Sequence, residues 1–69
     1  MNEDENTILE FLRSSPESAF GRKEIARKAA SRALYEENPR WPDAPLNALV
    51  DKKLIVMDDS GHFQFNPSP

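Results

Sequence analysis

Three prolines within seven residues, Pro39, Pro42 and Pro45, divide the chain into two parts. Proline lacks a backbone N–H and disfavours helical backbone in the residue before it, so a helix preceding this segment has to end by Asn38. Proline is tolerated in the first turn of a helix, and Asp43 is a favourable N-cap residue, so a new helix is predicted to begin there. The residues from Asn38 to Pro45 are therefore predicted to connect two helices.

On the N-terminal side of this connector, the residues from Thr7 to Glu10 have the pattern of a capping box. The apolar residues that follow have helical spacing, so the first helix is predicted over residues 7–14. The preceding residues 1–6 are polar and acidic, and we expect them to be disordered. The folded domain is accordingly predicted to span residues 7–66.

A second helical pattern begins at Arg22, where alanines and Ile25 form one stripe of mostly small side chains. Strong helix formers fill this stretch, so a single helix is predicted from Arg22 to about Ala33. After the connector, Leu46 and Leu49 have the spacing of a third amphipathic helix. The second predicted helix is expected to pack closely against its neighbours, because the side chains on one of its faces are small.

The C-terminal part has the pattern of a β-hairpin. Residues 54–57 form a strand-sized apolar run that is followed by Asp58, and residues 62–66 alternate apolar with polar side chains, which is typical of a half-buried strand. Gly61 closes the short polar loop between them. Residues 19–21 are predicted to form a further short strand, and residues 67–69 a frayed tail.

These patterns together predict an α+β fold with three helices, one short strand and a hairpin. Trp41 is predicted to pack as a lid over the alanine face of the second helix, because large aromatic side chains are highly buried on average. The other residues predicted to form much of the core are Phe11, Leu12, Phe20, Ile25, Leu46, Leu49, Ile55, Phe63 and Phe65.

Charge is distributed unevenly along the 69 residues, although the net charge is only −3. Residues 1–10 contain four acidic residues and no basic one, whereas residues 21–32 contain five basic residues and only Glu24 as an acid. Because salt screens fields beyond about 10 Å, such a basic block can attract a polyanion locally. The alternative is a solvated helix face that balances the acidic N-terminal residues.

The sequence lacks the residues that several classes of function require. The chain has no cysteine, and His62 is its single histidine, so neither a disulfide nor a zinc site is expected. No acid and base are paired for catalysis and no glycine-rich phosphate loop occurs, so we expect neither an enzyme nor a cofactor. No apolar run approaches the length of a membrane span. We expect a cytoplasmic protein that binds no metal or membrane.

The sequence resembles the winged helix-turn-helix family. The residues that carry this resemblance are Glu24-Ile25-Ala26, the stretch from Leu46 to Ile55 with the sequence LNALVDKKLI, and Gly61-His62-Phe63. The resemblance covers about residues 7–66. It implies a winged-helix fold, in which three helices pack on a small antiparallel sheet made of one short strand and a C-terminal hairpin, the wing.

The resemblance also implies DNA binding of the transcription-regulator type, with the third helix in a major groove and another helix across the phosphate backbone. Two features depart from the family: the connector is long and rich in proline, and the wing tip carries Asp58 and Asp59 instead of basic residues. We therefore expect weak or non-specific binding of double-stranded DNA. The candidate nucleic-acid-binding residues are Arg22, Lys23, Arg27, Lys28, Arg32, Asn47 and Lys52.

The alternative is a winged-helix module that binds a protein partner and no nucleic acid. Buried tryptophan and arginine side chains are common anchors of protein interfaces, and Arg40 and Trp41 are adjacent in the connector. Under this alternative, an exposed apolar or aromatic patch is expected around Trp41.

Overall fold

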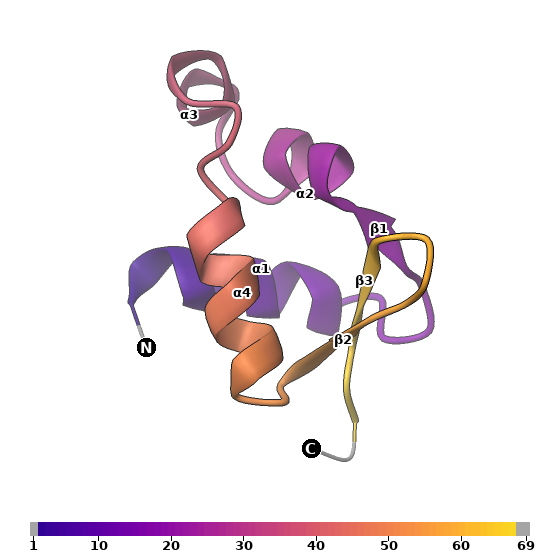
Figure 1. Cartoon of the computed structure of the whole chain (residues 1–69). Coiled ribbons are helices and arrows are strands. Elements are labelled where there is room, and N and C mark those ends of the chain that lie inside the picture. The colour runs from indigo at the N-terminus through magenta and orange to yellow at the C-terminus, as the bar shows by residue number, and fades with distance from the viewer. Residues whose placement is uncertain (1, 68–69) are drawn as a thin grey trace.

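The structure, a computed structural model, describes residues 2–67 and forms a small α+β domain (Figure 1). Four helices and three strands occur in this range, so the predicted α+β class is confirmed, with one helix more than predicted. Their order is α1 (Glu3–Arg13), β1 (Phe20–Gly21), α2 (Arg22–Lys28), α3 (Arg32–Glu37), α4 (Asp43–Asp51), β2 (Ile55–Met57) and β3 (His62–Phe65). The predicted frayed tail falls largely on residues 68–69, which lie outside the described residues.

The three strands form one antiparallel sheet in the order β1-β3-β2. Phe20 lies opposite Phe63, and Val56 lies opposite Gln64. The predicted hairpin and short strand are thus confirmed. The turn of the hairpin depends on Gly61, whose φ of 81° lies in the left-handed region that favours glycine.

The first helix begins four residues earlier than predicted. The side chain of Asn2 accepts a hydrogen bond from the backbone N–H of Glu5 at 2.8 Å, so Asn2 is the N-cap and Thr7 lies inside α1. Acidic residues in the first turn are favourable at the positive end of a helix. The expected disorder of residues 1–6 is therefore wrong for residues 3–6, and the capping box at Thr7 does not form.

The prediction of one long second helix is also wrong, because the helix is interrupted between Lys28 and Arg32. Two shorter helices, α2 and α3, form instead. Ser31 begins the new helix: its side-chain oxygen accepts a hydrogen bond from the backbone N–H of Leu34 at 3.2 Å. The indole N–H of Trp41 donates to the carbonyl oxygen of Ala26 at 3.0 Å. In a continuous helix, the N–H four residues after Ala26 would bond this carbonyl, so Trp41 replaces a helical hydrogen bond.

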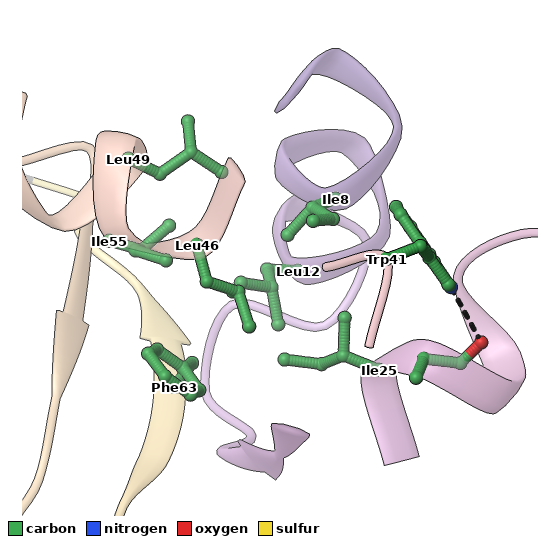
Figure 2. Packing of buried hydrophobic residues seen from close by; sticks show 9 residues of the cluster. Ile8, Leu12, Ile25, Trp41, Leu46, Leu49, Ile55 and Phe63 are labelled. Carbon is green, nitrogen blue, oxygen red and sulfur yellow. Dashed lines mark hydrogen bonds between the residues drawn. The ribbon is translucent and has the colours of Figure 1, made fainter. Parts of the chain in front are cut away.

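The core lies where α1, α2 and α4 meet the inner face of the sheet (Figure 2). Trp41 is only 6% exposed, which confirms its predicted packing. The predicted core residues Phe11, Phe20 and Phe65 are only partly buried at its margin, where the Phe11 and Phe20 ring centroids lie 4.9 Å apart. The buried apolar residues are Ile8, Leu12, Ile25, Ala26, Trp41, Leu46, Leu49, Ile55 and Phe63.

Helix α4 ends in a Schellman motif that joins it to β2. The N–H of Leu54 donates to the carbonyl of Leu49 at 3.1 Å, and the N–H of Lys53 donates to the carbonyl of Val50 at 2.9 Å. Lys53 occupies the left-handed position of this motif, with φ of 63°, where glycine is usual.

Replacing Lys53 with glycine is expected to raise the free energy of unfolding by about 0.5–1 kcal/mol. The substitution removes the steric cost of a Cβ at positive φ, which exceeds the added entropy of the unfolded chain. Ala48→Gly, inside the same helix, is the control and is expected to lower stability by about 1 kcal/mol. Urea unfolding followed by circular dichroism measures both; a K53G variant less stable than the parent would contradict the expectation.

Candidate nucleic-acid interface

Basic side chains from α2, α3 and the connector surround Tyr35. Two neighbouring hollows share this residue. One, of about 250 Å³, is lined by Arg22, Lys23, Tyr35, Pro39 and Arg40. The other, of about 390 Å³, is lined by Arg27, Arg32, Tyr35 and Glu36. We call the five cations and Tyr35 the basic surface.

Some of these cations are paired, and two are not. Arg32 Nε lies 2.9 Å from a Glu36 carboxylate oxygen, but both side chains are exposed, and exposed pairs contribute only about 0–1 kcal/mol. Lys23 and Arg27 form no ion pair or side-chain hydrogen bond within residues 2–67. These two exposed side chains are therefore available to an external anion, and Arg32 can exchange its partner at little cost.

Asp43 holds the remaining two arginines together. Its Oδ2 atom lies 3.1 Å from Arg22 Nη1 and 3.4 Å from Arg40 Nε. Asp43 was predicted to be the N-cap of the third helix, but it is the first residue inside α4, and Pro42 occupies the N-cap position. Its Oδ1 atom is buried without a hydrogen-bond partner in the described part of the chain. The carboxylate therefore orients two guanidinium groups instead of capping the helix.

Two of the predicted nucleic-acid-binding residues lie away from the basic surface. Lys28 lines neither hollow and pairs with Glu24 at 2.9 Å. Lys52 pairs with the buried Glu5 at 2.6 Å, which ties the end of α4 to the start of α1. Figure 1 shows α2 and α3 near the first turn of α4 and the turn into β2 at its other end. The helix rises about 13 Å between these ends.

Asn47 is exposed and lies one helical turn after Asp43 on the same face of α4. It therefore borders the basic surface without lining either hollow. Asp51 follows one turn later on this face and is also exposed. The structure thus gathers Arg22, Lys23, Arg27 and Arg32 as a group, with Asn47 beside it.

The structure adds two residues to this group that were not predicted to bind nucleic acid. Arg40 was predicted only as a partner-binding residue, and Tyr35 was not among the candidate site residues. Both join the basic surface because the chain turns at Ser31 and α3 packs back against α2. The one sequence signal for Arg40 is its position within the proline-rich connector, which brings the chain back from α3 to α4.

Trp41 does not form the exposed patch that the alternative function requires. Its side chain is buried and its N–H is bonded to Ala26, so it packs within its own domain. Arg40 is exposed beside it. The large apolar side chains that are exposed in the described residues are Val56 and Met57 of β2.

The turn of the hairpin is acidic. Backbone N–H groups of His62 and Ser60 each donate to Asp58 Oδ1 at 2.9 Å. The hydrogen bond from the backbone N–H of His62 is the main reason that the pKa of Asp58 is lowered. Desolvation opposes this effect, and the bond from Ser60 and the nearby imidazole lower the pKa further. The tip of the hairpin therefore stays negatively charged. Throughout residues 2–67, neither Asp58 nor Asp59 pairs with a cation of the basic surface.

Comparison of the chain with family models, with curated proteins and with solved structures gave no match. In the described range, no helix is both long and apolar enough to cross a membrane. No cluster of three or more potential metal-binding histidine or carboxylate side chains occurs in that range.

Proposed function

We propose that the chain is a DNA-binding module of the winged helix-turn-helix type that acts in transcription regulation and binds duplex DNA weakly and with little sequence preference. The element order and the sheet order β1-β3-β2 support the winged-helix assignment, with α4 as the groove-facing helix and β2–β3 as the wing. Helix α3 is an additional element between the two helices of the motif. It presents Tyr35 and Arg32 beside the cations of α2.

The basic surface is the observation that carries the proposal. Within residues 2–67, its five cations form ion pairs with two carboxylates, Asp43 and Glu36. Lysine and arginine side chains supply most of the affinity of proteins for duplex DNA by neutralising phosphates and releasing counterions. An excess of positive charge on one face suits this role, although the net charge of the chain is −3.

The outer face of α4 offers little for sequence readout. Asn47 is positioned to bond an adenine edge, but α4 carries no arginine, and Asp51 would repel phosphates farther along the same face. Contacts to phosphates position a protein on DNA without reading its sequence. Binding through the basic surface is therefore expected to depend on salt more than on sequence.

Titration of the protein with a short duplex of arbitrary sequence tests this function. For three phosphate contacts, affinity is expected to fall about 40-fold between about 50 and 200 mM salt, and amide shifts are expected on α2, α3 and Asn47. Reversing Lys23 and Arg27 together to glutamate is expected to weaken binding about tenfold or more at the lower salt.

Arg13→Glu supplies the matched control. Arg13 is an exposed cation on α1 that lines neither hollow, so reversing its charge changes the net charge without touching the basic surface. Absence of saturable binding at low salt would refute the proposal. The double variant changes the net charge twice as much as R13E does, so the losses in binding free energy are compared per reversed charge. Equal losses per reversed charge in R13E and in the Lys23 and Arg27 variant would show that only overall charge matters.

The protein-interaction alternative lacks its expected anchor, since Trp41 is buried. It would have to use Val56 and Met57, which are 46% and 56% exposed on the edge strand β2. The DNA titration separates the two functions, because DNA binding predicts shifts around Tyr35 and partner binding predicts none there.

A further inference from the structure

The smaller hollow beside Tyr35 differs from the rest of the basic surface in how its charges converge. Arg22 and Lys23 come from the first turn of α2, Arg40 comes from the connector, and all three line one concavity of about 250 Å³. Tyr35 and Pro39 supply its apolar wall. We call this concavity the connector hollow.

The charge of the connector hollow matches a doubly charged anion. Three cations line it, and among the described residues the carboxylate paired with them is that of Asp43, which leaves a local excess of two positive charges. A phosphate monoester carries about −1.5 to −2 at neutral pH, whereas each phosphodiester of a nucleic-acid backbone carries one charge.

The two arginines of the hollow share one carboxylate partner. Asp43 Oδ2 lies 3.1 Å from Arg22 Nη1 and 3.4 Å from Arg40 Nε, so the same carboxylate oxygen attracts both guanidinium groups toward the hollow. Each guanidinium has five N–H donors, and one pairing contact leaves most of them available. Arginine forks suit phosphate oxygens because they donate two parallel hydrogen bonds.

The shape of the connector hollow favours a terminal phosphate of a nucleic-acid strand over an internal phosphodiester. A phosphodiester has chain on both sides, and both chains would have to leave a concavity that Tyr35 and Pro39 line. A terminal phosphate has one substituent and three free oxygens, which correspond to the three cations. The first nucleoside then lies against Tyr35, because bases stack on aromatic side chains.

We infer that the connector hollow binds the terminal phosphate of a nucleic-acid strand, with Arg22, Lys23 and Arg40 on its oxygens and Tyr35 against the adjoining nucleoside. This inference rests on the proposed DNA-binding function and names the part of the DNA that this end of the basic surface recognises. Asp43 is a positioning residue that acts through the two arginines.

Two duplexes of the same sequence test the inference, one with 5′-phosphates and one with 5′-hydroxyls. The phosphorylated duplex is expected to bind the full chain about tenfold more tightly at low salt, the effect of one additional charge-assisted hydrogen bond. Side-chain N–H signals of Arg22 and Arg40 are expected to shift with the phosphorylated duplex and much less with the other. Equal affinity for the two duplexes overturns the inference and leaves the proposed function standing, whereas no binding of either overturns both.

Two matched variants locate the preference. Arg40→Gln removes a cation of the connector hollow whose side chain is 76% exposed, and is expected to abolish most of the tenfold preference. Arg32→Gln removes an exposed cation of the other hollow, and is expected to weaken binding of both duplexes while the preference remains. A preference that survives R40Q, or disappears in R32Q, overturns the assignment. So does a phosphoserine peptide that binds as tightly as the phosphorylated duplex, since the site would then not be specific for nucleic acid.

Discussion

Replacing Trp41 with alanine is expected to lower the free energy of unfolding by about 3–5 kcal/mol. The indole is 6% exposed and lies against Ile25 and α1, between the connector and α2 (Figure 2). Its loss leaves a cavity there and also leaves the Ala26 carbonyl without its 3.0 Å donor. A domain of this length has a total stability of only about 3–10 kcal/mol, so a large fraction of the variant is expected to be unfolded at 25 °C.

Trp41→Phe separates the two contributions of this residue. Phenylalanine retains most of the buried ring but lacks the N–H, so a smaller loss of about 1–3 kcal/mol is expected from the unpaired carbonyl. Urea unfolding followed by far-ultraviolet circular dichroism measures both variants without depending on tryptophan fluorescence. A W41A variant as stable as the parent would show that the connector does not close the core.

The elements that the sequence predicted correctly are those specified by neighbouring residues. The hairpin depends on alternation around Phe63 and on Gly61 in the turn, and both are local signals. The third predicted helix, α4, begins and ends close to its predicted limits because Pro45 and the spacing of Leu46 and Leu49 define it. The short strand predicted at residues 19–21 is present as Phe20–Gly21, directly before α2.

The errors occur where a distant residue or a competing cap decides the outcome. Helix propensity favours continuity through Ala29 and Ala30, but Ser31 caps a new helix and Trp41, from the connector, takes the Ala26 carbonyl. At the N-terminus, Asn2 competes with Thr7 as a cap and adds a first turn that places Glu5 beside Lys52. Neither pairing across the chain is visible in a local pattern.

Part of the candidate site was predicted correctly because that part consists of residues that are close in sequence. The cations of α2 are close in sequence, so a basic block was recognisable before any fold was known. The pairing of Lys52 with Glu5 was not recognisable, because the two residues lie 47 positions apart in the sequence. Arg40 joins the basic surface because of the path that the connector takes past α2, and no local pattern in the sequence predicts this path.

Replacing Leu12 with alanine is expected to lower the free energy of unfolding by about 2–5 kcal/mol. Four apolar residues of α1 have helical spacing, and the sequence predicted Phe11 and Leu12 as its core residues, whereas Ile8 and Leu12 are the ones that are fully buried. In the structure Leu12 is completely buried and points toward Ile25 and Leu46, at the point where α1 meets α2 and α4 (Figure 2). Truncation there removes contacts with both helices at once.

Leu9→Ala is the matched control, because it makes the same change in the same helix at a partly buried position at the margin of the core. It removes less buried apolar surface, and since the cost of truncation scales with the area and cavity involved, a loss of about 1 kcal/mol is expected. Both variants are compared by urea unfolding at the same protein concentration. Similar losses for Leu9 and Leu12 would mean that α1 is rotated from its position against α4, and the salt bridge between Glu5 and Lys52 would then be misplaced as well.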